Sequence, residues 1–129
     1  MRGDTLVEVL IAISIISAVL GGAYVSANRS SKAIRTAQER SEALKIAAET
    51  QMERIKVAAD NNSPDIFSPG DFCLDPALNT SPPCSIVVGG VTYDTTVNHV
   101  AGSHDFAVKV IWDSLSGGKN NVELYYRTQ

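Results

Sequence analysis

The stretch that decides the fold is Leu6–Ala27, which reads LVEVLIAISIISAVLGGAYVSA and holds one charged residue, Glu8. At about 1.5 Å per residue, a helix of this length extends for about 33 Å, enough to cross the hydrocarbon core of a membrane. The apolar run is longer than that of a cleaved secretory signal, and no small-residue cleavage site clearly follows it. We therefore expect a membrane-spanning helix that stays attached, in which something must offset the cost of the Glu8 carboxylate.

The helical pattern continues beyond this run, because residues 28–59 contain neither proline nor glycine. Apolar residues recur there at spacings of three, four and seven, which predicts one stripe on a helix: Ile34, Ala37, Leu44, Ala48, Met52, Ile55 and Ala59. The glycine pair 21–22 is open to two interpretations, a close-packing site with a mild bend or a place where the helix can unwind. We predict one helix over about residues 5–59, ended by the run Asp60–Pro64.

After this helix the pattern changes. Residues 60–84 are rich in proline, serine and asparagine, and we expect a loop region that holds both cysteines. Apolar and polar residues then alternate in short runs separated by turns, and these runs are 85–88, 91–98, 106–113 and 122–127. Each run has one apolar face that needs a cover. We predict an α+β fold in which the amphipathic second half of one long N-terminal helix packs on a four-stranded antiparallel sheet.

The cysteine pair, Cys73 and Cys84, allows two interpretations. If the chain is exported, a disulfide is expected, and closing so short a loop contributes roughly 3 kcal/mol in the chain-entropy description. The alternative is a pair of reduced surface thiols. A zinc site that also uses His99 and His104 is not favoured, because the close cysteine spacing of structural zinc sites is missing.

Other chemistry finds little support in the sequence. Catalytic residues in a recognisable arrangement and cofactor-binding motifs are both missing, so we predict neither an enzyme nor a cofactor. The 11 basic and 14 acidic residues give a net charge of −3, and 6% of residues are aromatic. This composition does not support nucleic-acid binding.

The N-terminal residues resemble the type IV pilin and pseudopilin family. The resemblance rests on Arg2-Gly3 followed by TLVEVLIA at residues 5–12: a basic leader that ends in glycine, then an apolar run with a lone glutamate, Glu8. The close match covers about 25 residues. The predicted long helix, loop and antiparallel sheet also match the architecture of that family, with less specificity, over the whole chain.

The resemblance implies roles for three residues. A prepilin peptidase is expected to cleave after Gly3, so that Asp4 becomes the first mature residue. Its new α-amino group is expected to meet the Glu8 carboxylate of the same or a neighbouring copy, which offsets the cost of burying each charge. The alternative for Glu8 is that its side chain reaches the cytoplasmic interface of the membrane.

Two positions depart from the family pattern. The first mature residue in the family is usually a phenylalanine that becomes N-methylated, whereas here it is Asp4, so methylation stays open. The leader, residues 1–3, is short, so either the true start lies upstream or a minimal leader suffices. The cysteine pair also precedes the predicted sheet, whereas many family members carry one near the C-terminus.

These observations predict a structural subunit, major or minor, of a type IV pilus or a related secretion or competence filament. The expected partners are other pilin subunits, the prepilin peptidase, an inner-membrane assembly platform and the cytoplasmic membrane. The subunit would cross the membrane once before assembly and lie in a pilus or periplasmic filament afterwards. The alternative is a monomeric signal-anchored exported protein with a ligand- or envelope-binding β domain. The expected organisation is leader 1–3, filament-core helix 4–27, amphipathic helix 28–59, loop region 60–84 and sheet 85–129.

Overall fold

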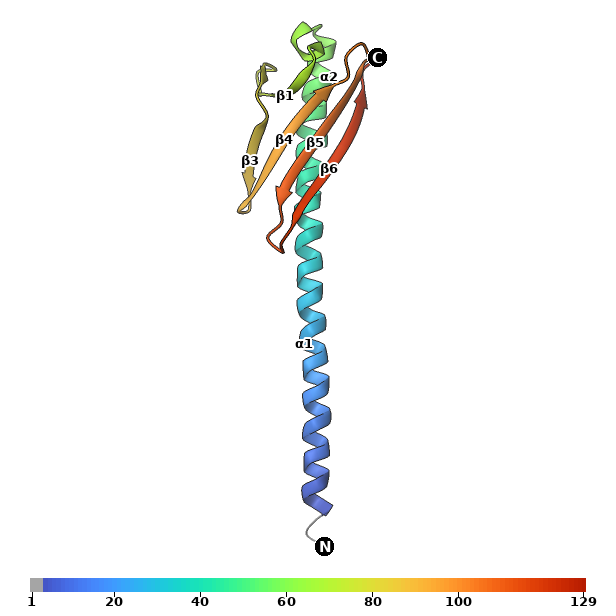
Figure 1. Ribbon diagram of the computed structural model, residues 1–129, viewed down its shortest axis with the longest axis vertical. Helices are drawn as coiled ribbons and strands as arrows, with labels where there is room; N and C mark the ends of the chain where they lie inside the picture. The colour runs from blue at the N-terminus through green and yellow to red at the C-terminus, as the bar shows by residue number, and fades with distance from the viewer. Residues whose placement is uncertain (1–3) are drawn as a thin grey trace. The chain divides into compact units, whose positions relative to one another are not determined.

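The structure is a computed structural model that describes residues 4–129. The chain divides into two compact units, Met1–Arg35 and Thr36–Gln129. Helix α1, Asp4–Lys45, begins in the first unit and is followed directly by the π-helical segment η1, Ile46–Met52, and by α2, Glu53–Asp60 (Figure 1). The helix therefore extends from Thr5 to Asp60, which confirms the predicted helix.

The helix ends where the sequence predicted, through a specific hydrogen-bonded turn. Asn62 adopts a positive φ of 52°. Its N–H donates to the Ala59 carbonyl oxygen, and the Ser63 N–H donates to the Ala58 carbonyl oxygen, each over 3.0 Å. These are the two bonds of a Schellman motif, in which asparagine tolerates the left-handed conformation that usually takes glycine.

The second unit contains a six-stranded antiparallel sheet. A short 3-10 helix, η2, Pro64–Phe67, leads into it. The strands are β1 Gly70–Leu74, β2 Thr80–Ser81, β3 Cys84–Val88, β4 Val91–His99, β5 Asp105–Asp113 and β6 Lys119–Arg127. Their order is β2-β1-β4-β5-β6, and β3 also pairs with β4. The turn between β3 and β4 is the pair Gly89-Gly90, with φ of 59° and 83°, as a two-residue type I′ turn requires.

The prediction of four strands was wrong in number, because β1 and β2 lie in the segment expected to be a loop. Strand β1 buries three consecutive residues, Phe72, Cys73 and Leu74, so the period-two alternation that identifies strands is missing. Strand β2 has only two residues, which is too short to show any period. The class, a long helix and an antiparallel sheet, is confirmed.

Strands β1 and β3 share one edge of β4, end to end. Phe72 of β1 lies opposite Val97, and Cys84 of β3 lies opposite Thr95. The chain therefore leaves this edge after β1, passes through β2, and returns to the same edge as β3. The other edge of β4 pairs with β5 along its length.

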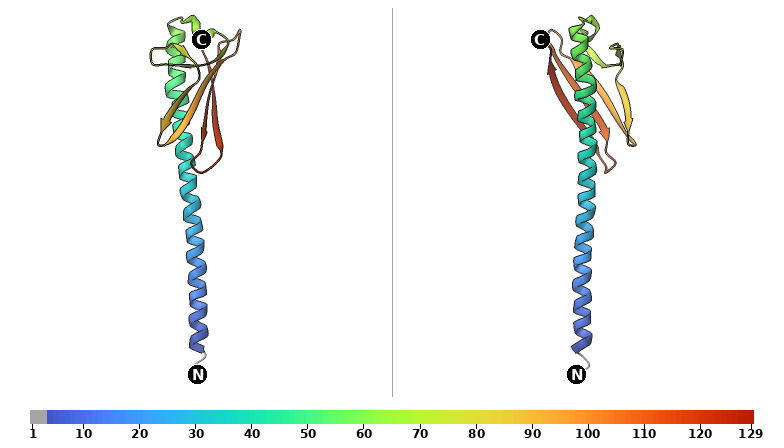
Figure 2. Two further views of the ribbon diagram at one scale, coloured as in Figure 1. Left: turned by 60° about the vertical axis from the view of Figure 1, so that its left-hand side comes forward. Right: turned by 180° about the vertical axis from the view of Figure 1, so that it is seen from behind.

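Within the second unit, the helical residues 36–60 lie against one face of the sheet (Figure 2). This face supplies the core, in which Tyr93, Val97, Phe106, Val108 and Val110 are almost fully buried. The opposite face carries exposed polar side chains, among them Thr92, Asp94, Lys109 and Glu123. The sheet thus has the one apolar and one solvated face expected of antiparallel strands beside a helix.

The predicted stripe on the helix was placed with the wrong phase. Leu44 and Ala48 are exposed, as are Ile34 and Ala37, and of the predicted stripe only Ile55 is fully buried. The buried positions instead recur at every fourth residue, and they are Glu39, Ala43, Ala47, Gln51 and Ile55, with Ile46 and Ala58 beside them.

The π-helical segment explains this spacing. In an uninterrupted α-helix, positions four apart drift by about 40° around the axis at each step. The wider turn of η1, Ile46–Met52, offsets that drift, so that residues before and after it face the same sheet. Part of the predicted stripe, Leu44, Ala48 and Met52, also recurs at every fourth residue, so it differs from the buried positions in the face it occupies and not in its spacing.

Candidate assembly helix and the anchoring of the sheet

The first unit presents an apolar surface around the helix. Its large apolar side chains are between 49% and 74% exposed, and they are Leu6, Val7, Val9, Leu10, Ile11, Ile13, Ile15, Ile16, Val19, Leu20, Tyr24, Val25 and Ile34. The helix is long and apolar enough to cross a membrane, and no part of its most apolar window is buried. A helix that is apolar on all sides is stable only in lipid or against other apolar surfaces.

Polar groups in this unit differ in how they are satisfied. The Ser14 hydroxyl donates to the Leu10 carbonyl oxygen over 2.8 Å, a bond within the helix that removes the cost of a free hydroxyl in an apolar setting. Glu8 lies on the exposed surface of α1, and no hydrogen bond or ion pair joins it to another described residue. The proposed pairing of Glu8 and its alternative, a side chain that reaches the membrane interface, therefore both stay predictions.

The predicted processing site lies at the start of α1. Asp4 is the first described residue and the first residue of this helix. Gly3 lies outside the described residues. The proposed cleavage after Gly3 and the pairing of the new amino group with Glu8 therefore stay predictions.

Gly21 and Gly22 lie inside α1, which stays helical through both. A Cβ atom added at either position would meet no other atom within 4 Å. Packing among the described residues therefore gives no reason for glycine, and both interpretations of the pair stay open.

In the second unit, a buried carboxylate joins the helix to the sheet. The Glu39 side chain is 6% exposed. It accepts hydrogen bonds from Trp112 Nε1 over 3.2 Å and from the Leu115 backbone N–H over 3.1 Å. Two donors compensate for part of the cost of burying this acidic side chain.

A tyrosine supports the same junction. The Tyr93 hydroxyl donates to the Glu39 carbonyl oxygen over 3.3 Å. Burial, and after it the negative charges of Glu39 and Glu42, raise the pKa of Tyr93 above its ordinary value. The hydroxyl therefore keeps its proton and its donor role throughout the neutral range.

A second buried polar side chain, Gln51, lies in the π-helical segment and is fully buried. Its Oε1 accepts from the Leu74 N–H over 3.1 Å, and its Nε2 donates to the Leu74 carbonyl oxygen over 3.3 Å. The side-chain amide thus bonds β1 in the way that a neighbouring strand would. Sequence reasoning missed Glu39 and Gln51 because polar residues were assigned to the outer faces of the helix.

The two cysteines form a disulfide, with 5.8 Å between the Cα atoms. Cys73 follows Phe72 at the end of the β1–β4 pairing, and Cys84 begins β3, so the bond joins the two strands where they meet on the edge of β4. Gln51 Nε2 also lies 3.3 Å from Cys73 Sγ. This confirms the predicted disulfide, and the bonded cysteines are not available as metal ligands.

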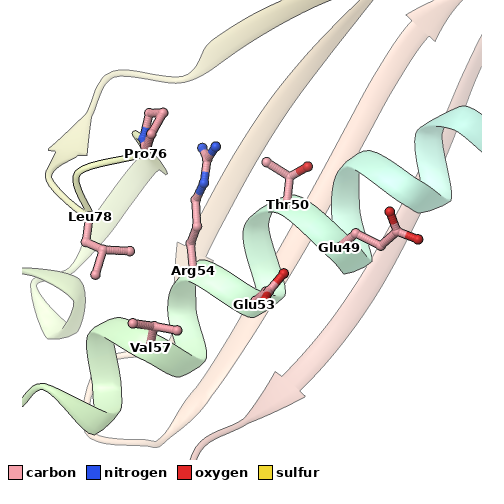
Figure 3. Close-up of a pocket in the computed structure, with 7 residues that line it drawn as sticks. All are labelled: Glu49, Thr50, Glu53, Arg54, Val57, Pro76 and Leu78. Atoms are coloured by element: carbon pink, nitrogen blue, oxygen red, sulfur yellow. The ribbon is translucent and has the colours of Figure 1, made fainter.

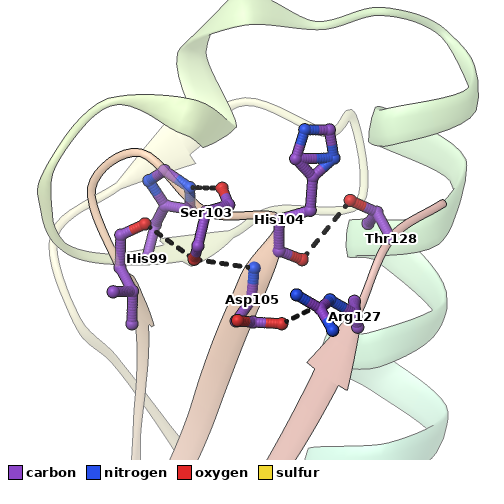
Figure 4. A network of polar contacts seen from close by, with 7 residues as sticks. His99, Ser103, His104, Asp105, Arg127 and Thr128 are labelled. Carbon is purple, nitrogen blue, oxygen red and sulfur yellow. Dashed lines mark hydrogen bonds and ion pairs between the residues drawn. The ribbon is translucent and has the colours of Figure 1, made fainter.

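The two histidines lie near one end of the sheet (Figure 4). His99 is buried, and its Nε2 donates to the Ser103 carbonyl oxygen over 2.9 Å. The Phe67 ring lies within 6.0 Å of both imidazole rings, between centroids. Near them, Asp105 and Arg127 form an ion pair over 3.1 Å, and the Thr128 N–H donates to the His104 carbonyl oxygen over 3.0 Å. This arrangement fastens the end of β6 to β5.

A groove of about 380 Å³ lies between the helix and the loop that the disulfide closes (Figure 3). Its lining residues are Glu49, Thr50, Glu53, Arg54, Val57, Pro76 and Leu78. Among the described residues, neither Glu49 nor Glu53 has an ion pair. The lining combines three apolar side chains with two carboxylates and the Arg54 guanidinium.

Comparison with known proteins gives one match. Residues 2–24 match the family described as the prokaryotic N-terminal methylation motif. The search of curated proteins found no match, and neither did the search of solved structures. The matched segment covers the predicted processing site, Glu8 and most of the apolar surface of the first unit. The chain therefore carries the N-terminal methylation motif that is characteristic of type IV pilin and pseudopilin precursors.

Proposed function

We propose that the chain is a structural subunit of a type IV pilus or of a related type II secretion or competence filament. The single observation that carries the proposal is the apolar surface of residues 6–25, which is exposed on every side and lies, except for Val25, inside the matched motif. Such a surface needs lipid before assembly and copies of the same helix afterwards.

The proposed sequence of events uses the residues at the N-terminus. The prepilin peptidase hydrolyses the peptide bond between Gly3 and Asp4. This frees an α-amino group on Asp4, which is positively charged at neutral pH. The amino group then pairs with the Glu8 carboxylate in the assembled filament, where both charges are removed from water. The inner-membrane assembly platform transfers the subunit from the cytoplasmic membrane to the filament.

Mass spectrometry of the chain from cells with an active prepilin peptidase tests the proposal. The expected result is a mature chain that begins at Asp4 and is found in isolated filaments. The Gly3→Ala variant serves as the control, and it should stay uncleaved because the peptidase site needs the smallest side chain there. A chain that still begins at Met1 and never enters filaments would exclude the filament function.

The groove between the helix and the disulfide loop supports a second candidate, a monomeric membrane-anchored protein whose sheet unit binds a ligand. Its volume of about 380 Å³ falls within the range of small-ligand sites. This candidate predicts an intact leader and a chain that stays in the membrane fraction, so the same measurement separates the two functions.

A further inference from the structure

The sheet has two unpaired edges at opposite margins. Within the described residues, β3 pairs only with β4, and β6 pairs only with β5. Figure 1 shows β3 and β6 on opposite sides of the sheet. Each edge presents backbone N–H and C=O groups that a further strand can bind.

The β3 edge lacks the usual protection. Natural edge strands are commonly guarded by charged side chains, whereas β3 reads CSIVV and has no charge. Val88 and Val91 flank the two-residue turn and form a hydrogen-bonded pair. Every second residue of β3, counted back from Val88, therefore directs its N–H and C=O groups to β4. Ser85 and Val87 therefore direct their N–H and C=O groups away from the sheet. The Val87 side chain is also 68% exposed.

The strand directions suit a junction between copies of equal orientation. Strands β3, β4, β5 and β6 pair antiparallel in that order, so β3 and β6, the outer two of four, run in opposite directions. When two copies stand side by side and point the same way, β3 of one lies antiparallel to β6 of the other. Copies related by the symmetry of a filament meet this condition.

The side chains of the two edges also match in one register. With Val87 opposite Tyr125, the outer face gains a β-branched and aromatic pair, and Tyr125 is 75% exposed in the single chain. On the inner face the same register brings together Ile86 with Tyr126 and Val88 with Leu124. Of these, Ile86, Leu124 and Tyr126 are partly buried at the open margins of the core.

We propose that the outer edge of β3 in one copy pairs antiparallel with the outer edge of β6 in a neighbouring copy, with Val87 opposite Tyr125. The inference rests on the proposed filament function. The contact uses two different surfaces, so it is heterologous and extends an assembly instead of closing a dimer. It covers the margins of the core at both sides of every subunit.

Disulfide cross-linking in isolated filaments tests the register. The full chain with Val87→Cys and Tyr125→Cys is assembled and then treated with a mild oxidant. Within one copy, β3 and β6 are three strand spacings apart, about 14 Å, which is too far for an internal bond. The expected product is a ladder of covalent oligomers. The matched control is Val87→Cys with Asn121→Cys, which places the second thiol on the same face of β6 but out of register, and its ladder should be several-fold weaker.

Filaments whose ladder is no stronger than that of the control would overturn the edge pairing and leave the filament function intact. A wild-type chain that forms no filaments would overturn both. If the double variant fails to assemble, a second pair of variants decides. Val87→Pro removes the outward N–H without removing a bond to β4, so it should lower filament yield several-fold, whereas Val87→Thr keeps the N–H and the β-branched shape. Equal yields from these two variants would refute the edge pairing.

Discussion

The carboxylate of Glu39, on the helix, lies 3.2 Å from the indole Nε1 of Trp112, on β5, and accepts its hydrogen bond. Glu39 also accepts from the Leu115 N–H, in the turn between β5 and β6. One buried side chain thus fixes both a strand and its turn to the helix. The sole tryptophan of the chain reports directly on this junction.

Replacing Glu39 should loosen the junction. Glu39→Ala leaves the buried Trp112 Nε1 donor without its partner and removes the bond to the partly buried Leu115 N–H, and we expect a loss of about 1–3 kcal/mol in the free energy of unfolding. Denaturant unfolding of the full chain in micelles, followed by tryptophan fluorescence, measures the change. Glu49→Ala, on the exposed side of the helix, is the control and should change stability little. Equal effects of the two substitutions would contradict this role for Glu39.

Replacing Thr95 should stabilise the chain, whereas replacing Glu39 should destabilise it. Its side chain is fully buried, and its hydroxyl has no hydrogen-bond partner among the described residues. Thr95→Val keeps the shape and removes the unsatisfied group, so we expect a gain of about 1 kcal/mol. The same unfolding measurement checks it, with Thr96→Val on the outer face as the comparison. A destabilised Thr95→Val chain would mean that the hydroxyl has a partner in solution.

The loop closed by the disulfide should respond to acid. Hydrogen bonds from Asn79, first from its backbone N–H and then from its side chain, hold the pKa of Asp75 below its ordinary value of 3.8. A lowered pKa in the folded state means that the stabilisation is present above the ordinary pKa and is lost as the pH falls through the folded value. We expect the amide NMR signals of Ala77 and Asn79 to titrate below pH 3.8. In Asp75→Asn this titration should vanish, and its persistence would assign it to another group.

The proposed pairing of the Asp4 amino group with Glu8 predicts that a substitution can affect filament entry without affecting cleavage. Glu8→Ala should leave cleavage after Gly3 largely intact, because the peptidase acts on the bond before Asp4. It should impair entry into filaments, because the new amino group loses its partner in an apolar setting. Comparing cleaved chain in membranes with chain in isolated filaments measures this. Wild-type entry would mean that the Asp4 carboxylate replaces Glu8.

The sequence alone predicted the parts of the fold that follow a regular period. The helix over residues 5–60 was recognised because no proline interrupts it, and the four later strands because apolar and polar residues alternate. The disulfide was expected because an exported chain enters an oxidising compartment, where cysteine pairs form disulfides. Strand β1 was missed because Phe72, Cys73 and Leu74 are all buried, which hides any alternation.

The helix face was misassigned for a different physical reason. Two of the buried positions, Glu39 and Gln51, are polar, so the apolar residues one position further along, Leu44, Ala48 and Met52, were assigned to the buried face instead. The sequence does carry a signal for the buried face. Every fourth residue from 39 to 55 is small, apolar or able to form hydrogen bonds. The partners of these polar residues, Trp112 and Leu74, are distant in sequence, so only the folded chain reveals them.

The disulfide between Cys73 and Cys84 has a consequence for how the chain tolerates change. It ties the ends of β1 and β3 at the edge of β4, so residues 75–83 form a ring that is closed at its base. Extra residues grafted at the exposed Ala77 would enlarge this ring while the strand register on either side stays fixed. The position is therefore suited to carry an epitope or a fluorescent label.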